Sequence, residues 1–350
     1  MRKERITELE TVRALAILAV LVIHVTASGT VELPSGGVSR GIYLVLNKLS
    51  NFSVPAFVLM SGLVLFYRYG DDWGKGQAAA FYRKRLQYIV LPYLVWSGFY
   101  IVYNRLIHGE AVTGITLSRL GDNLLWGEAS YHLYFIVLIV QYYALFPLLM
   151  AAAKKGGGGS LLLIGLVLQA GAFYYNHAVA EIPHRSAFGL TYLGEFCIGG
   201  ALGLGYREWI SRLKPRQTAV WALSGLLGAG LAWIHLAGPD RFSWGPEGAE
   251  AIVHAYSVAV SVALLLAGSS LLRSSPGMAR FLTALGAASF GVYLIHPAVL
   301  TAWAVSFSYP PGSPAYHLSN AGAFAVGLAV SWGVFLLLRR AKAGWVLLGK

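Results

Sequence analysis

Residues 321–338 read AGAFAVGLAVSWGVFLLL and contain no charged side chain. A helix that crosses the hydrocarbon core of a bilayer, about 30 Å thick, needs about 20 mainly apolar residues. This stretch is therefore expected to span a membrane. Other stretches of similar length and composition occur along the chain, so the sequence predicts an all-α, polytopic membrane protein with about ten transmembrane helices. The predicted spans are 9–29, 51–67, 86–106, 131–150, 160–176, 190–206, 218–237, 251–272, 281–303 and 320–338.

The composition also indicates that the bilayer is the solvent of this chain. Of its 350 residues, 57% are hydrophobic and 12% are charged, whereas soluble domains have about 25% charged residues. A soluble enzyme, a disordered chain and a collagen-like fibre are excluded. The single cysteine, Cys197, excludes an intrachain disulfide and a cysteine-based zinc site. We expect Cys197 to be inert packing, and no metal site is predicted.

The formal net charge of +12 is interpreted as an orientation signal. Lys and Arg gather on the cytoplasmic side of membrane proteins, and placing both termini inside puts most of the 27 Lys and Arg residues there. The outer side would hold Arg40, Lys48, Arg105, Arg119, Arg185 and Arg241. The predicted topology is N-in/C-in, with no nucleic-acid partner. All nine histidines would lie in the outer half, either by chance or because they line an outward-facing vestibule.

The predicted first helix carries three ionisable residues in an otherwise aliphatic stretch. Glu10 precedes Arg13 by three residues, and His24 follows Arg13 by eleven. At about 100° per residue, Arg13 and His24 share one face of a helix, about 16 Å apart along its axis, and Glu10 can pair with Arg13. Ionisable groups within a span are functional candidates because burying them is costly. The alternatives are that Arg13 extends to the inner headgroups and that His24 only hydrogen-bonds a neighbouring helix.

Five short motifs, in chain order, resemble those of the acyltransferase 3 family, membrane-bound acyltransferases of cell envelopes. They are Glu10–His24 (E-x-x-R followed by ten residues and H), Val54–Gly62 (VPAFVLMSG), Tyr82–Tyr93 (YRKR leading to LPY), His132–Phe135 (HLYF) and Ser289–Pro297 (SFGVYLIHP). Tyr134 stands where the family commonly has tryptophan. Each motif alone is weak, but five in order along most of the chain, together with ten predicted spans, make the resemblance specific.

The resemblance implies an enzyme that moves an acyl group, commonly acetyl, from cytosolic acyl-CoA to a hydroxyl of an envelope polysaccharide or related glycan. Acyl-CoA and a glycan or lipid-linked sugar would be its partners, with no permanently bound cofactor. The implied location is the bacterial cytoplasmic membrane. Some family members carry an added extracellular esterase-like domain, whereas residues 1–350 are expected to form a single transmembrane domain without one.

Acyl transfer from a thioester needs a base, a stabiliser for the oxyanion and a grip on the phosphates of the donor. His24 is expected to act either as the base or as a covalent acyl carrier, and the sequence is compatible with both roles. Arg13 would guide the donor, and Glu10 would orient Arg13. The residues expected to bind acyl-CoA are Arg83, Lys84, Arg85 and Arg13, since guanidinium groups suit phosphate. Ordinary positive-inside anchoring is the alternative for the basic cluster at residues 83–85.

Five further residues are candidates for the acceptor side or for support of the site. They are His132, Glu195, Tyr293, His296 and Ser61. Glu195 is an acid well inside a later span, so a partner such as Arg13 or a tyrosine is expected. The two histidines could line the acceptor path or could be interfacial and packing residues. Ser61 with Gly62 indicates close helix packing more than chemistry.

A transporter or flippase of a polysaccharide or small polar substrate is the main alternative to an enzyme. Glycine-containing spans and charges within the membrane also fit a substrate path. A non-catalytic scaffold is a third interpretation, and the cost of burying Arg13 and His24 argues against it. Transfer of label from acetyl-CoA by the purified protein separates an enzyme from a carrier.

Overall fold

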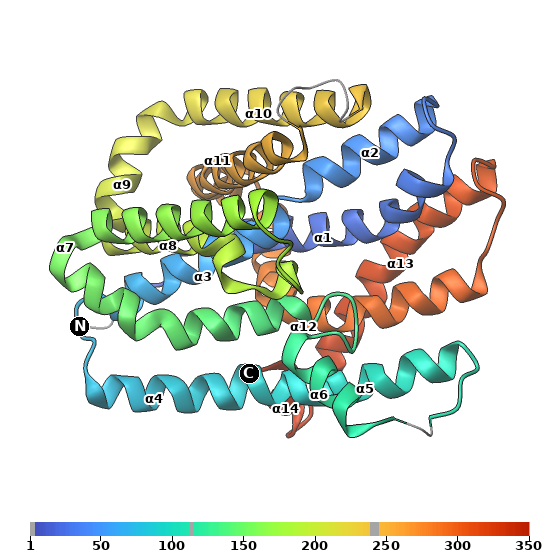
Figure 1. Cartoon of the computed structure of the whole chain (residues 1–350), viewed down its shortest axis with the longest axis horizontal. Helices are drawn as coiled ribbons and strands as arrows, with labels where there is room; N and C mark the ends of the chain where they lie inside the picture. The colour runs from blue at the N-terminus through green and yellow to red at the C-terminus, as the bar shows by residue number, and fades with distance from the viewer. Residues whose placement is uncertain (1–3, 113–114, 239–244, 350) are drawn as a thin grey trace. The chain divides into compact units, whose positions relative to one another are not determined.

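The computed structural model describes residues 4–112, 115–238 and 245–349, and within these ranges the chain is helical with no β-strand (Figure 1). The α-helices are α1 (Glu8–Glu32), α2 (Val38–Ser50), α3 (Ser53–Tyr69), α4 (Lys75–Arg85), α5 (Leu91–Ile107), α6 (Leu117–Trp126), α7 (Tyr134–Ala178), α8 (Leu193–Leu204), α9 (Tyr206–Leu213), α10 (Gln217–Ala237), α11 (Gly245–Ser274), α12 (Pro276–Ser306), α13 (Pro314–Leu338) and α14 (Gly344–Leu348). A π-helical turn, Leu86–Val90, joins α4 to α5, and short 3₁₀ turns are Arg185–Ala187, Gly189–Tyr192 and Lys214–Arg216. The predicted all-α class is confirmed.

Eight helical segments of the described chain are long and apolar enough to cross a membrane. The expected spans 131–150 and 160–176 fall in α7, which counts as one candidate although it consists of two helices that meet at a kink at Gly157, where φ is 63° and ψ is −157°. A glycine tolerates this positive φ without strain, so the glycine run at 156–159 forms a turn between the two helical stretches. The expected span 190–206 coincides with a shorter apolar segment, Gly189–Leu204. These two differences account for eight candidates against ten, and both the number of spans and their orientation stay predictions.

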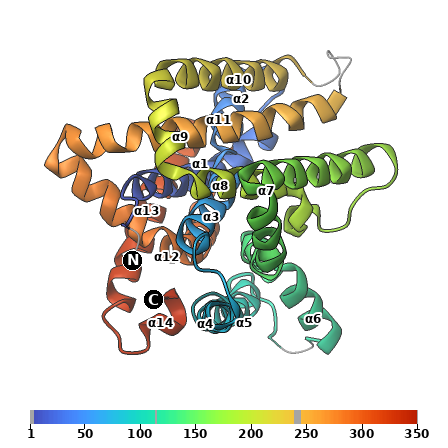
Figure 2. The same ribbon diagram turned by 90° about the vertical axis from the view of Figure 1, so that its left-hand side faces the viewer.

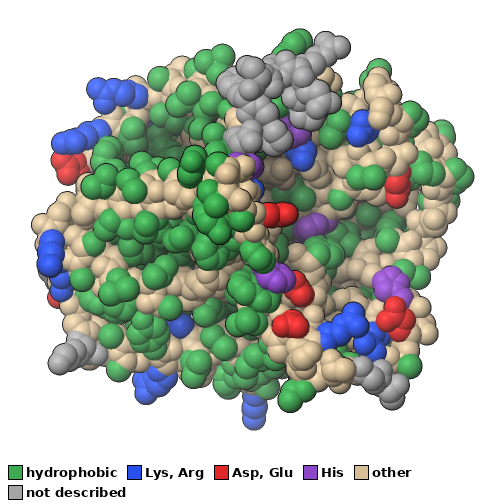
Figure 3. Space-filling view, viewed as in Figure 1, with side chains coloured by type: hydrophobic (Ala, Val, Ile, Leu, Met, Phe, Trp, Pro, Cys, Tyr) green, Lys and Arg blue, Asp and Glu red, His purple; other side chains and the backbone are tan. Residues whose placement is uncertain are grey.

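Hydrophobic side chains cover much of the face displayed in Figure 3, as expected of a surface that meets lipid. Exposed leucines include Leu163 of α7, Leu226 of α10 and Leu337 of α13. In water, such exposed apolar area would favour aggregation. In a bilayer it matches the solvent, which is consistent with a polytopic membrane protein.

The chain divides into two compact units, each built from three stretches of sequence. The first unit comprises Met1–Ser61, Gly205–Ser289 and Ser306–Ala329, and the second comprises Gly62–Leu204, Phe290–Val305 and Val330–Lys350. The division falls within α3, α12 and α13.

In the first unit, α1 packs against α2 and α11, and α10 packs against the same two helices (Figures 1 and 2). Two glycines let neighbouring helices approach the start of α1. Gly268 of α11 lies against Glu8, and Gly286 of α12 lies against the backbone of Glu10, so closely that an added methyl group would overlap in both places. These contacts fix the turn of α1 that carries Glu10.

In the second unit, glycines set the packing of α3 on α8. A methyl group added at Gly62 would overlap the carbonyl of Phe196, and one added at Gly203 would overlap the backbone of α3 at Leu63. Close helix approach through small residues is typical of membrane proteins. Cys197 is fully buried with its thiol free, as expected of an inert packing residue.

Candidate active site

The first group of candidate residues lies on α1, which is one continuous helix from Glu8 to Glu32. Helix geometry therefore applies along the whole stretch between Arg13 and His24, and it places the two residues on one face. The other candidates, from Arg83 to His296, belong to the second unit and are described there.

Glu10 is the buried anchor of the charged group on α1. Its side chain is 4% exposed, and its Oε1 atom accepts hydrogen bonds from the guanidinium groups of Arg5 and Arg13. The bond from Arg13 Nη1 is 3.4 Å long, and the Arg13 side chain is 30% exposed. One carboxylate therefore serves two guanidinium groups, and the group as a whole keeps a positive charge. Arg13 is held in place while most of its donors stay available to an anion.

His24 is half-buried, and the backbone beside it is held by α2. The Asn47 side-chain amide donates to the Ile23 carbonyl at 2.9 Å and to the Thr26 hydroxyl at 3.1 Å. That hydroxyl donates in turn to the Val22 carbonyl at 2.6 Å. The turn of α1 that carries His24 is thus fixed by hydrogen bonds from a neighbouring helix, which limits the positions open to the imidazole.

Ser61 has its hydroxyl engaged within its own helix. Its Oγ donates to the Phe57 carbonyl at 2.8 Å, a bond to the preceding turn that serine commonly makes in helices. Its neighbour Gly62 makes the close approach to α8 described above. This arrangement agrees with the packing role favoured by the sequence, and a role for Ser61 on the acceptor side stays a prediction.

In the second unit, His132 and His296 lie together and are fully buried. Their ring centres are 5.6 Å apart. His132 Nδ1 is 3.1 Å from the Ser130 hydroxyl, and His296 Nδ1 is 3.1 Å from the Val292 carbonyl. Because a carbonyl can only accept, His296 Nδ1 carries the proton in this bond, and Nε2 is the acceptor atom of the neutral ring. The structure therefore brings together two histidines that lie far apart in sequence.

Two tyrosines complete this histidine cluster. Tyr293 donates its hydroxyl proton to the backbone carbonyl of His132, and the ring centres of Tyr100 and His132 are 5.0 Å apart. Tyr100 also donates to the Leu294 carbonyl at 2.7 Å. Leu294 lies in the turn of α12 before Pro297, where the missing proline N–H disturbs the helical bonding. The cluster thus ties α5, the start of α7 and the proline-containing turn of α12 into one buried assembly.

The basic cluster at the end of α4 divides into exposed and inserted residues. Arg83 and Lys84 are exposed, whereas Arg85 is half-buried. The guanidinium carbon of Arg85 lies 4.9 Å from the ring centre of Phe81 and 4.6 Å from that of Tyr143. These distances are those of cation–π contacts. Its buried Nε has no hydrogen-bond partner within the described chain. Arg85 is therefore held by two rings, while its neighbours are free to move.

The helix changes its winding immediately after this cluster. Leu86–Val90 form a π-helical turn, a rare conformation that occurs often at functional sites. The short helix α14 packs against this turn and against α5, where Trp96 Nε1 donates to the Leu347 carbonyl at 2.8 Å. The C-terminal segment thus supports the helix that follows the basic cluster.

Glu195 is almost fully buried at the first turn of α8. It lies near Tyr142, whose hydroxyl donates to the Gly189 carbonyl at 2.8 Å, so a tyrosine partner for Glu195 stays a prediction. The Gln169 side chain accepts from the Gly194 backbone N–H at 2.6 Å. Side chains of α7 therefore position the start of α8, where Glu195 is found.

Sequence reasoning missed three residues that shape these sites. Arg5 precedes the start of α1, so helical spacing could not connect it with Glu10. Asn47 lies outside the predicted spans, and its partners on α1 are set by tertiary packing. Tyr100 belongs to an aromatic run within the predicted span 86–106, and its partners lie far away in the sequence. Among the described residues, no three His, Cys, Asp or Glu side chains are grouped so as to hold a metal ion.

Comparison with known proteins identifies the family. The family described as an acyltransferase domain, acyltransferase 3, matches residues 6–339, nearly the whole chain. No curated protein and no solved structure matches the chain. The matched range includes α1 with Arg13 and His24, the basic cluster after α4, and the two buried histidines. The chain belongs to the acyltransferase 3 family and is a membrane acyltransferase.

Proposed function

We propose that this protein transfers an acyl group, acetyl in the first instance, from cytosolic acyl-CoA to a hydroxyl of an envelope glycan. The observation that carries the proposal is the arrangement on α1. Arg13 shares the single Glu10 carboxylate with Arg5 and is partly exposed, while His24 lies three turns further along the same face. A cation for the donor and a proton acceptor for the reaction are thus held on one helix.

The donor would bind through its phosphates. Coenzyme A is polyanionic, and guanidinium groups bind phosphate through paired hydrogen bonds. Arg83 and Lys84 are exposed and so are available to the nucleotide, whereas Arg85 is held against Phe81 and Tyr143. Arg13 would then guide the pantetheine arm toward His24. The acceptor would arrive from the opposite side of the membrane.

His24 would supply the chemistry in one of two ways. As a base, it takes the proton of the acceptor hydroxyl while the oxygen attacks the thioester carbonyl; the C–O bond forms, the C–S bond breaks, and the imidazolium returns the proton to the thiolate. As an acyl carrier, its ring nitrogen displaces coenzyme A first, and the acceptor hydroxyl then takes the acyl group. Both routes give free coenzyme A and an ester.

The test is His24→Ala in a strain that lacks the chromosomal copy. Mass spectrometry of the envelope glycans should show the acyl mass restored by the wild-type protein and absent with His24→Ala. The purified variant should still bind coenzyme A. His235→Ala is the matched control, because His235 is also a half-buried histidine of a predicted span and, within the described residues, hydrogen-bonds its own helix at the Leu231 carbonyl. Full acylation by His24→Ala would refute the proposed role.

Acyl-imidazole formation separates the two routes. Purified protein mixed with acetyl-CoA labelled in the acetyl group, without acceptor, would retain label on the His24 peptide if His24 is the carrier. Label that stays with acetyl-CoA until acceptor is added indicates direct transfer. A transporter or flippase would release no coenzyme A from acetyl-CoA, whether the acceptor is present or absent.

A further inference from the structure

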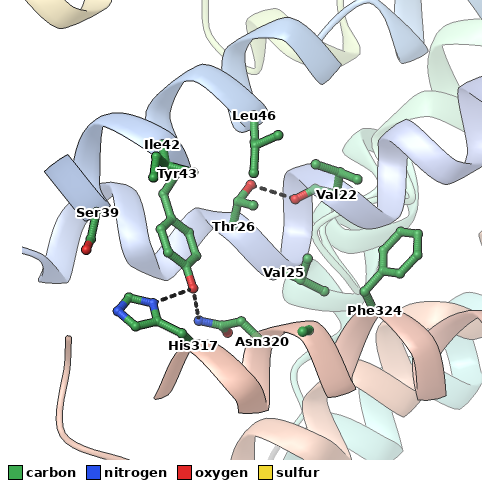
Figure 4. Close-up of a pocket in the computed structure, with 11 residues that line it drawn as sticks. Val22, Val25, Thr26, Ser39, Ile42, Tyr43, Leu46, His317, Asn320 and Phe324 are labelled. Carbon is green, nitrogen blue, oxygen red and sulfur yellow. Dashed lines mark hydrogen bonds between the residues drawn. The ribbon is translucent and has the colours of Figure 1, made fainter. Parts of the chain in front are cut away.

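A cavity of about 590 Å³ lies within the first unit, between α1, α2 and α13 (Figure 4). This volume is in the range of small-molecule sites, about 300–1,000 Å³. Val22 and Val25 of α1, Ile42 and Leu46 of α2, and Phe324 of α13 form its apolar walls. The cavity is therefore built from three helices that belong to candidate membrane-spanning segments of the structure, Glu8–Glu32, Val38–Tyr69 and Pro314–Leu338.

The cavity does not belong to the face of α1 that carries the candidate catalytic residues. At about 100° per residue, the lining residues Val22, Val25 and Thr26 point about 120–180° away from Arg13. His24 shares the face of Arg13 and does not line the cavity. A ligand here would thus occupy the opposite side of α1 from the proposed acyl-transfer site.

One end of the cavity is polar, as Figure 4 shows. The Tyr43 hydroxyl is 3.1 Å from His317 Nδ1 and accepts a hydrogen bond of 3.1 Å from the Asn320 amide. These bonds leave the Asn320 side-chain oxygen and His317 Nε2 without a hydrogen bond to the described chain. The Thr26 hydroxyl, by contrast, is taken by Val22 and Asn47. The polar end therefore offers both donors and acceptors to a hydroxylated group.

The other end opens on a surface that lipid would cover. Ile42 and Leu46 line the cavity and are 55% and 48% exposed, on a helix within the candidate span Val38–Tyr69. A ligand can therefore enter from the hydrocarbon region with its chain leading along apolar side chains. The geometry suits a molecule with a hydrocarbon tail and a polar head.

The lack of charged side chains in the lining favours a ligand with a neutral head group. No charged side chain of the described chain lines the cavity. Glu32 lies beside it, bound to the Tyr316 hydroxyl at 3.0 Å, and Tyr316 is the chain neighbour of His317. A phosphate head would find no Lys or Arg among the lining residues. Arg40, the chain neighbour of Ser39, donates to the Thr30 carbonyl at 2.9 Å and to the Ser35 hydroxyl at 3.2 Å. The rings of Tyr43 and His317, whose centres are 5.7 Å apart, suit the mixed polar and apolar faces of a sugar.

We propose that this cavity binds a neutral glycolipid of the membrane, with its alkyl chain along Val22, Ile42 and Phe324 and its sugar hydroxyls at Tyr43, His317 and Asn320. Binding there does not require acyl transfer, so this inference stands or falls separately from the proposed function.

The test uses the full chain in phosphatidylcholine nanodiscs with an alkyl glucoside that carries a photoreactive diazirine in its chain. Irradiation should label peptides of α1, α2 or α13. Excess unlabelled alkyl glucoside should abolish the labelling, and an alkyl phosphate of equal chain length should not. Ala321→Phe fills the cavity and should remove the labelling, while Ala325→Phe, one turn further along α13 and outside the cavity, should leave it unchanged.

Asn320→Leu tests the polar end without filling the cavity. It should raise the probe concentration for half-maximal labelling several-fold, since one hydrogen bond to the sugar is lost. Equal thermal unfolding midpoints of the variants and the wild-type protein show that the fold is kept, and if Ala321→Phe does not fold, Asn320→Leu and Tyr43→Phe carry the test. Labelling that survives Ala321→Phe in a folded protein, unchanged half-saturation in Asn320→Leu, or equal competition by the alkyl phosphate would overturn the proposal.

Discussion

The charged group on α1 and the histidine cluster of the second unit are both built from titratable residues within predicted spans, yet they are held in opposite ways. Arg13 keeps 30% of its side chain exposed and shares one carboxylate with Arg5. His132 and His296 are fully buried, with hydrogen bonds to a serine and a backbone carbonyl and with rings around them. The first arrangement leaves a partly exposed cation accessible, whereas the second encloses two rings, each hydrogen-bonded through its Nδ1 atom.

This difference separates two kinds of contribution to a membrane enzyme. A partly exposed cation can exchange its internal partner for a substrate anion at little cost, because its charge is already solvated in part. A buried, hydrogen-bonded ring contributes to stability and to the position of the helices around it. We therefore expect α1 variants to lose activity while keeping stability, and cluster variants to lose stability first.

Arg13→Ala is the strongest test of the α1 side of this comparison. Loss of a charge-assisted bond to the donor should lower kcat/KM for acyl-CoA by about 10-fold to 100-fold. The thermal unfolding midpoint should change little. Arg5→Ala is the matched variant, since it removes the other partner of Glu10, and its effect on kcat/KM should be smaller. An equal loss in both variants would mean that the charge of the group matters and the position of Arg13 does not.

His296→Leu tests the opposite side. Removing the ring should destabilise the protein by about 1–2 kcal/mol, because a buried hydrogen bond and ring contacts with His132 are lost. The measurement is the thermal unfolding midpoint of the purified protein, followed by tryptophan fluorescence. Activity per folded molecule should hold within a few-fold. If activity vanishes in a variant of unchanged stability, His296 belongs to the acceptor path and the comparison fails.

Asn47→Leu tests whether the hydrogen bonds from α2 position His24 on α1. The amide holds the turn that carries His24 through two hydrogen bonds from α2, and small misplacements of a catalytic group are costly. We expect kcat to fall several-fold while KM for acyl-CoA stays the same, because Arg13 lies three turns away. Measuring both constants is essential: a rise in KM with kcat intact would show that Asn47 does not position His24.

Tyr100→Phe should give the smallest effect. It removes the hydroxyl that donates to the Leu294 carbonyl near Pro297 and keeps the ring against His132. The expected loss of stability is about 1 kcal/mol, seen as a small drop in the unfolding midpoint. If Tyr100→Phe loses more stability than His296→Leu, then the hydrogen bond to Leu294 contributes more to the stability of the cluster than the histidine pair does.

Much of the fold could be predicted because membrane segments obey strong local rules. Segment 321–338 needed only its length and lack of charge to be placed in a helix. The pairing of Glu10 with Arg13 followed from helical spacing alone. Arg5, Asn47 and the approach of His132 to His296 could not be predicted, since they depend on which helices pack together. The cavity between α1, α2 and α13 could not be predicted for the same reason.

The glycine run at 156–159 shows where the local rules were sufficient. Glycines usually end helices, so this run separates two predicted spans. In the structure the helical angles are lost at Gly157, where two helices meet at a kink. The position of the turn could therefore be predicted from composition alone, whereas the packing of the two helices on their neighbours could not.

The π-helical turn at Leu86–Val90 has a consequence for changes in the length of this chain. A π turn holds one more residue than the α-helical turn it replaces. Because the extra residue is taken up within that turn, removing one residue there would restore regular winding and leave the direction of the side chains beyond it nearly unchanged. Trp96 and Tyr100 would then still face α14 and the histidine cluster. Loss of one residue from the regular part of α4 or α5 would instead rotate everything beyond it by about 100°, so this turn should tolerate a one-residue deletion better than the helices on either side of it.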